Sequence, residues 1–241
     1  MPASVIPSWL YLPGIAAPGG TYTLPEDEAH YVGRVCRAKP GECATATDGA
    51  GTVADLQVYK VARHVEVTVL GRRFVERPHE ARVLCGTPEG SRADWLVEKL
   101  AELGIAQLVP LECARENWRG ARLDRARKIA VAALRQSRNA WLLQVSEPAT
   151  VPEAIAGLSG PAARWIGEAG APNRWAPVEI PPASVAAIGP APGFTREERD
   201  RFANDGFLPV RLAPVRLRTE TAAIAWASGW AAQLDASGFQ P

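Results

Sequence analysis

The sequence predicts two parts with different folds: a small β-domain at the N-terminus and a larger α/β domain with a largely parallel sheet after it. Two observations predict this division. Residues 1 to about 75 read as short strands broken by turns, whereas later apolar runs alternate with helical patterns. The charged connector 72–80 separates the two patterns. The 241 residues suffice for one large domain or two smaller ones.

The N-terminal part contains five runs with the character of short strands, at 9–12, 21–24, 42–47, 53–61 and 65–70. Asp48-Gly49 and Ala50-Gly51 lie where a hairpin would reverse its direction. One helix is expected over 27–36, after Pro25. These features predict a small β-barrel or sandwich.

The C-terminal part alternates strands, expected at 81–86, 107–111, 163–166, 184–188 and 207–212, with helices, expected at 91–103, 123–138, 195–204 and 219–234. In the first of these helices, Leu96, Leu100 and Leu103 recur at helical spacing, and Gly104 ends it. Ligands of largely parallel sheets gather at the loops beyond the carboxyl ends of the strands. These loops are therefore the first candidates for a site.

Charge gives a local signal only. The net charge of +1 does not support nucleic-acid binding by the chain as a whole. The stretch from Arg115 to Arg138 nevertheless carries eight arginines and lysines against Glu116 and Asp124. This run predicts a phosphate-binding surface, although a solvated helix face would give the same pattern.

Several classes of protein gain no support. The four cysteines form no CxxC pair, and the three histidines lie far from any metal-ligand spacing, so we expect no metal site and no Cys/His nucleophile. No window approaches the ~18 apolar residues of a membrane span. The first residues lack the plan of a signal peptide. A cytoplasmic protein is expected.

Three loops that follow predicted strands stand out, at 167–170, 188–194 and 211–222. The second runs into a helix for which Thr195 and Glu198 predict a capping box. Glycines allow close approach of the backbone to a ligand, and a helix N-terminus offers unpaired N–H groups. None of the loops has the GxGxxG or Walker pattern. The residues alone therefore indicate an α/β enzyme and leave its ligand open.

At the third loop, Leu217-Arg218-Thr219-Glu220-Thr221-Ala222-Ala223 resembles the terminal motif of the ribosomal RNA small subunit methyltransferase E family, of the knotted SPOUT class. Ile188-Gly189-Pro190 with Gly193-Phe194 is similar to that family's glycine-rich loop. Other similar motifs follow in the family's order, at 28–30, 34–35, Arg37, 39–41, 48–49, 94–99, 102–104 and 136–137. The resemblance covers nearly the whole chain.

The resemblance implies a PUA-like RNA-binding β-barrel over 1–75 and a SPOUT methyltransferase domain with a C-terminal trefoil knot over 76–241. It implies a homodimer that uses S-adenosyl-L-methionine to methylate N3 of a uridine in 16S rRNA of the small ribosomal subunit. Two alternatives stay open: an RNA-binding pseudoenzyme with weakened cofactor binding, and a SPOUT methyltransferase with another RNA target.

The resemblance also assigns residues. Arg218 is the candidate for stabilising the deprotonated uracil, because a guanidinium is permanently charged and donates two parallel hydrogen bonds. Glu220 could orient Arg218 or act as a base, and equally could only complement the helix dipole, the role we favour. RNA phosphates are expected to bind to the side chains of Arg34, Arg37, Arg115 and Arg135. Cofactor contacts are expected from Glu168, Ile188, Gly189, Pro190, Gly193, Phe194, Leu212, Leu217, Thr219, Thr221 and Ala222.

The glycine-rich loop departs from the family pattern, which usually reads Gly-Pro-Glu-Gly-Gly. Here Ala191 and Pro192 replace a glutamate and a glycine. Pro192 fixes φ near −65° and lacks an N–H. Smaller departures occur at Ala213, Val215, Arg216 and Asn139. We therefore expect the loop to bind the cofactor, but more weakly.

Overall fold

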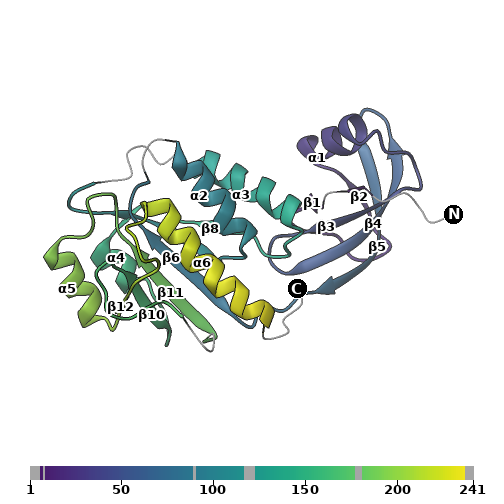
Figure 1. Cartoon of the computed structure of the whole chain (residues 1–241). Coiled ribbons are helices and arrows are strands. Elements are labelled where there is room, and N and C mark those ends of the chain that lie inside the picture. The colour runs from purple at the N-terminus through teal and green to yellow at the C-terminus, as the bar shows by residue number, and fades with distance from the viewer. Residues whose placement is uncertain (1–5, 8, 89–90, 117–122, 177–180, 237–241) are drawn as a thin grey trace. The chain divides into compact units, whose positions relative to one another are not determined.

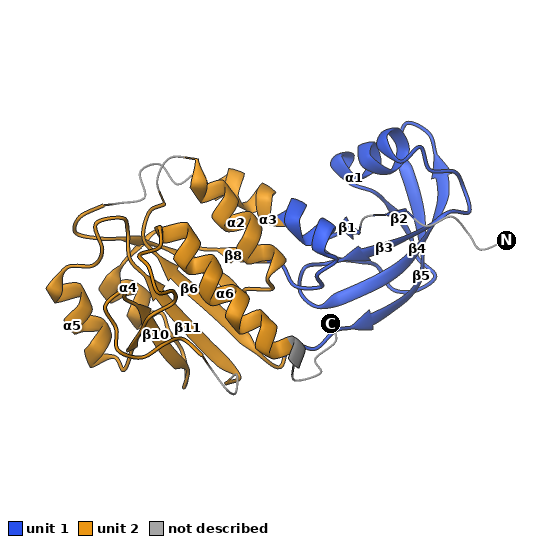
Figure 2. Cartoon of the chain, viewed as in Figure 1, with its two compact units in different colours: residues 1–77, 131–142, 241 blue, residues 78–130, 143–240 orange. Residues whose placement is uncertain are grey.

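The computed structural model describes residues 6–7, 9–88, 91–116, 123–176 and 181–236. These residues fall into two compact units (Figure 2). One contains the residues up to Arg77 together with Val131–Leu142, and the other contains Pro78–Ala130 and the residues from Leu143 onward. No helix in the described part of the chain has the length and apolar character needed to cross a membrane.

The first unit is built on a curled, five-stranded sheet with the order β1-β3-β4-β5-β2. β3, β4, β5 and β2 pair in antiparallel fashion, whereas β1 runs parallel to β3. The pairing of β4 with β5 shifts register twice, and such irregularities bend and twist a sheet. The strands are β1 (Leu10–Tyr11), β2 (Thr21–Thr23), β3 (Cys43–Thr47), β4 (Thr52–Val61) and β5 (Val65–Phe74).

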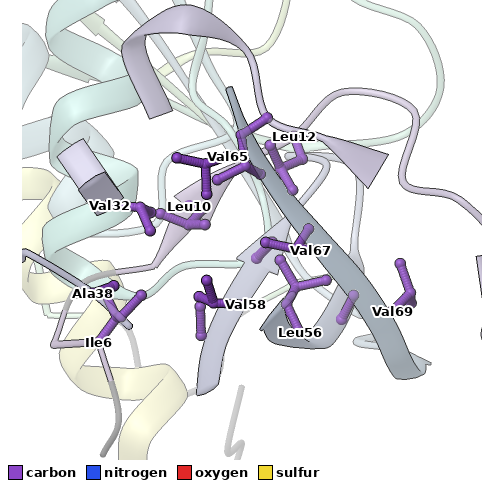
Figure 3. Packing of buried hydrophobic residues seen from close by; sticks show 14 residues of the cluster. Ile6, Leu10, Leu12, Val32, Ala38, Leu56, Val58, Val65, Val67 and Val69 are labelled. Atoms are coloured by element: carbon purple, nitrogen blue, oxygen red, sulfur yellow. The ribbon is translucent and has the colours of Figure 1, made fainter. Parts of the chain in front are cut away.

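The alternation of side chains along these strands places one face in the core (Figure 3). On β4, Leu56 and Val58 are buried while Gln57 between them is exposed, as the period of two requires. Helix α1 (Glu26–His30) continues into a π-helical turn, η1 (Tyr31–Val35), and confirms the helix predicted over 27–36. The core they enclose contains Ile6, Leu10, Leu12, Val32, Leu56, Val58, Val65, Val67 and Val69.

A segment from much later in the sequence completes this unit. Helix α3 (Leu123–Ser137) carries Arg135, which forms an ion pair with the buried carboxylate of Glu28. After the helix, the Ala140 carbonyl accepts hydrogen bonds from Thr47 Oγ1 and from Gly51 N–H, each at 3.0 Å. Residues 131–142 are therefore structural members of the first unit.

The second unit contains a parallel sheet with the strand order β12-β10-β11-β6-β7-β8, and β9 pairs with β7 beside it. Its central strand β11 is buried at five successive positions, the pattern of a strand covered on both faces. This sheet confirms the predicted α/β class. The strands are β6 (Glu80–Cys85), β7 (Gln107–Glu112), β8 (Gln144–Val145), β9 (Ala149–Thr150), β10 (Ala163–Gly167), β11 (Ala183–Ile188) and β12 (Leu208–Val210).

Helices surround this sheet (Figure 1). They include α2 (Arg92–Glu102), α4 (Val151–Ala156), α5 (Arg196–Asn204) and α6 (Thr219–Ala236). The C-terminal helix α6 packs against α2, β11 and β6, although the strand before it, β12, lies at the edge of the sheet. This return path is consistent with the knotted C-terminus that the resemblance implies.

Candidate active site

Three loops meet at one edge of the second unit's sheet. β12, β10 and β11 are parallel neighbours, so their carboxyl ends face the same way and the loops that follow them lie together. They enclose a pocket of about 400 Å³. Ten of the eleven predicted cofactor residues line it: Glu168, Ile188, Gly189, Pro190, Gly193, Phe194, Leu212, Leu217, Thr219 and Ala222. Thr221 does not line this pocket.

The glycine-rich loop is held by close backbone contacts. A Cβ at Gly86, directly after β6, would lie 2.4 Å from Pro190 N, so only glycine allows the two segments to approach this closely. Thr219 Oγ1 donates a 2.9 Å hydrogen bond to the Gly189 carbonyl and joins the start of α6 to the loop. Gly193 adopts a positive φ of 76°, a conformation that favours glycine. The loop is therefore fixed from two sides.

The capping box predicted at the start of α5 is present. The Glu198 side chain accepts a hydrogen bond from Thr195 N–H at 2.7 Å, and the Thr195 hydroxyl accepts one from Glu198 N–H at 3.2 Å. The other carboxylate oxygen of Glu198 accepts from Ala114 N–H at 2.8 Å. Glu198 therefore connects the helix that follows the glycine-rich loop to the segment after β7.

Glu168 has a partner inside the pocket that the sequence analysis missed. Its carboxylate lies 3.6 Å from the Arg199 guanidinium, which also donates a 2.7 Å hydrogen bond to the Phe194 carbonyl. Arg199 lines the pocket from α5. Nothing in the sequence distinguishes it from the neighbouring arginines of that helix, because the pairing depends on a contact between distant segments.

A second, smaller pocket of about 250 Å³ adjoins the first and contains both predicted catalytic residues. It is lined by Ala191, Arg216, Leu217, Arg218, Thr219 and Glu220, and all of these except Arg218 and Glu220 also line the first pocket. Arg218 is exposed, whereas Glu220 is only 3 % exposed. The Glu220 carboxylate lies 3.2 Å from the guanidinium of Arg92, in the first turn of α2.

The predicted RNA-binding arginines fall into two groups. Arg34 and Arg37 are exposed at the end of η1 and just after it. Arg115 donates a 3.0 Å hydrogen bond to the Pro192 carbonyl in the glycine-rich loop, and Arg135 is paired with Glu28. The structure therefore gives these last two side chains contacts within the protein.

The rest of the basic run is only partly described. Arg125 pairs with Asp94 at 2.6 Å, and Arg127 lies 3.8 Å from both Asp124 and Glu147. Arg119 and Arg122 lie outside the described residues. Within the described part, much of the helix's positive charge is thus opposed by nearby carboxylates.

Comparison with known proteins identifies the family to which the chain is similar. The family of RNA methyltransferase domains matches residues 75–231. Ribosomal RNA small subunit methyltransferase E of Mycobacterium bovis is 29 % identical over 228 residues, which cover 88 % of this chain and 87 % of that protein. The protein of the same name from Synechocystis is 29 % identical over 211 residues, covering 84 % of this chain and 70 % of that protein.

A solved structure is similar over nearly its whole length. The crystal structure of ribosomal RNA small subunit methyltransferase E from Neisseria gonorrhoeae, bound to S-adenosyl methionine, matches with a TM-score of 0.85 and 26 % identity. The match covers 95 % of this chain and 97 % of that one. The likeness therefore includes both units.

Proposed function

The chain belongs to the family of RNA methyltransferase domains, and on this premise we propose that it is an S-adenosylmethionine-dependent methyltransferase of small-subunit ribosomal RNA. The observation that carries the proposal is the pocket at the three loops, in a chain that resembles a methyltransferase solved with that cofactor. By the same resemblance, the acceptor atom is N3 of a uridine in 16S rRNA.

The residues of the first pocket fit S-adenosylmethionine. The volume of about 400 Å³ is within the range of about 300–1,000 Å³ that is common for small-molecule sites. Ile188, Leu212 and Leu217 supply an apolar seat for the adenine, and Glu168 supplies a carboxylate for a hydroxyl or for the sulfonium. Gly189 and Gly193 keep the backbone open to close approach.

We assign the second pocket to the target uracil. When bound, the cofactor supplies an electrophilic methyl group and would leave as S-adenosylhomocysteine, so the protein's main tasks are to align N3 and to favour loss of its proton to solvent water. Deprotonation spreads negative charge onto O2 and O4 of the uracil. The Arg218 guanidinium can donate two parallel hydrogen bonds to such a group and stabilise its charge.

Glu220 serves this site by position rather than as the base. Its carboxylate lies in the first turn of α6, where it complements the helix dipole, and it pairs with the Arg92 guanidinium at 3.2 Å. These two interactions hold the carboxylate in place at the start of the helix. We assign it the task of fixing the start of α6, next to Arg218.

We assign RNA docking to the first unit, as a PUA-like barrel. Arg34 and Arg37 contact RNA phosphates there, and such contacts position the RNA without reading its sequence. Arg115 and Arg135 belong to the proposed RNA surface only if they exchange their present partners for phosphate. The target base must leave its stack to reach the pocket.

We also propose a cytoplasmic homodimer. Ribosomal RNA as substrate supports the location. Support for the dimer comes from α6, which carries small and apolar residues on all sides, including the exposed Ser228 and Ala232. A helix of this composition is normally covered on all its faces.

Primer extension tests the proposal. The purified chain is incubated with S-adenosylmethionine and with small subunits from a strain that lacks the modification. We expect one new stop at a uridine, because N3 methylation blocks Watson–Crick pairing. Binding of RNA without methyl transfer would identify a pseudoenzyme instead, and a stop only in another RNA would identify a different target.

A further inference from the structure

We propose that Arg115 and Arg216 are positioning residues that hold the turn Pro190–Gly193 in the shape that cofactor binding requires. This inference rests on the proposed function, because it concerns the same pocket. It gives Arg115 a different task from phosphate binding, the role suggested by its place in the basic run. It gives Arg216, to which the sequence analysis assigned no function, a task of its own.

The evidence begins with the backbone carbonyls of the glycine-rich loop. The first three carbonyls, those of Ile188, Gly189 and Pro190, accept hydrogen bonds from backbone N–H groups and from one hydroxyl. Gly86 N–H donates to the Ile188 carbonyl at 2.8 Å, and Gly193 N–H donates to the Pro190 carbonyl at 2.7 Å. The Gly189 carbonyl accepts from Thr219 Oγ1. Of the carbonyls from Ile188 to Pro192, two remain, those of Ala191 and Pro192.

Both remaining carbonyls accept from arginine side chains. Arg216 Nη2 donates to the Ala191 carbonyl at 2.6 Å, and Arg115 Nη1 donates to the Pro192 carbonyl at 3.0 Å. The donors come from different parts of the chain, one from the loop before α6 and one from the segment after β7. Successive peptide groups of the turn are thus held by two independent guanidinium groups.

The composition of the turn explains why side chains are needed. Pro190 and Pro192 have no N–H, so the turn can form few backbone hydrogen bonds of its own. Fixed φ angles at two positions limit its shapes but do not set its place relative to the neighbouring loops. The two arginines supply contacts that set this place.

The position of the turn affects both pockets. Ala191 and Arg216 line the first pocket as well as the second, so the hydrogen bond between them lies in the shared wall. Loss of this bond would let the wall move and would change the cofactor pocket. A phosphate contact alone would not have this effect.

The test separates a positioning role from an RNA-binding role. Arg115→Ala and Arg216→Ala are compared with the wild-type chain by calorimetric titration with S-adenosylmethionine, by RNA binding and by thermal unfolding. Arg196→Ala is the matched control, because it removes one positive charge from an exposed site whose pair, Asp200, lies on the same helix. Arg216→Lys keeps the charge and one donor.

We expect each alanine variant to bind the cofactor about fivefold more weakly, equivalent to about 1 kcal/mol for one hydrogen bond. RNA affinity should stay at the wild-type value, and the unfolding temperature should fall by no more than the about 2–4 °C that one lost hydrogen bond costs in a chain of this size. Arg216→Lys should recover part of the loss of cofactor affinity, and Arg196→Ala should bind the cofactor normally. Unchanged cofactor affinity in both alanine variants, or a loss of RNA affinity alone, would overturn the inference. A wild-type chain that does not bind S-adenosylmethionine would overturn the proposed function as well.

Discussion

Replacement of Gly86 by alanine tests how the glycine-rich loop is held. The added Cβ would lie 2.4 Å from Pro190 N, 2.6 Å from its Cδ and 2.8 Å from its Cα, whereas ordinary contacts begin at 3.4 Å. The atoms in the way are backbone and a proline ring, which have no other rotamer to adopt. The turn must therefore move by about 1 Å, and overpacking of this kind costs about 1–3 kcal/mol of stability.

We expect Gly86→Ala to lower the free energy of unfolding by that amount, and to lower the methyl-transfer rate by about 10²-fold, since a 1 Å misplacement can have this effect. Urea unfolding, calorimetric titration with S-adenosylmethionine and single-turnover kinetics measure the changes. Gly157→Ala is the control, because Gly157 has a φ of −75° and its nearest neighbours would lie at 3.4 and 3.6 Å. Wild-type stability and rate in Gly86→Ala would refute the reasoning.

Three further predictions concern Arg218, the exposed arginines of the first unit and the buried Glu28. Arg218→Ala should lower the methyl-transfer rate by about 10²–10³-fold, as the loss of one charge-stabilising donor does, with cofactor affinity kept; normal turnover would exclude the catalytic assignment. Arg34→Glu with Arg37→Glu should weaken RNA binding and flatten its salt dependence, by ~0.7–0.9 in logarithmic slope per lost phosphate contact; an unchanged slope would place the RNA elsewhere. Burial raises the pKa of Glu28, although Arg135 and the Tyr11 N–H act in the opposite direction. The carboxyl group therefore holds its proton more tightly in the folded state than in the unfolded state. The contribution of Glu28 to the free energy of unfolding should fall as the pH rises from 4.5 toward the raised pKa of the folded state. Glu28→Gln should abolish this dependence of stability on pH in acid unfolding titrations.

The order of strands and helices could be predicted because it depends on local patterns. All ten predicted strands and all five predicted helices have counterparts, since periods of two and 3.6 and the glycine stops operate within short windows. The short elements β8, β9 and α4 were missed. For α4 a signal existed, because Thr150 and Glu153 form a capping box directly before an apolar pair.

The place of residues 131–142 could not be predicted from such patterns. Their membership of the first unit depends on Arg135 meeting Glu28 and on Ala140 meeting Thr47, contacts that join residues about a hundred positions apart. Helical periodicity describes which face of α3 is apolar and does not say which part of the protein covers it. The predicted helix was therefore correct, while its structural partners were unknown.

The site shows the same limit. Its three loops were identified because glycines and helix starts follow predicted strands, and the resemblance supplied the candidate ligand. The side chains that hold the site came only from the structure. These contacts join distant segments of the chain. They are the ion pairs of Arg92 with Glu220 and of Arg199 with Glu168, and the close approach of Gly86 to Pro190.

The last prediction concerns the two residues at which the loop departs from the family pattern. Pro192 lacks an N–H, so a cofactor contact through that amide cannot form, and one lost hydrogen bond is worth about 1 kcal/mol. Combined Ala191→Glu and Pro192→Gly should therefore strengthen S-adenosylmethionine binding about fivefold. Neither substitution removes a backbone acceptor, and the Pro192 carbonyl keeps its bond to Arg115.

Titration of the single and double variants separates the two contributions to this gain. Pro192→Gly restores the N–H but frees the backbone, which weakens the folded loop by about 0.4–1 kcal/mol relative to proline. Ala191→Glu instead places a carboxylate beside the Arg216 guanidinium, which can pair with it and leave the Ala191 carbonyl. If the double variant binds the cofactor no better than the wild-type chain, the missing amide does not limit affinity. The arginine contacts would then already compensate for the altered loop.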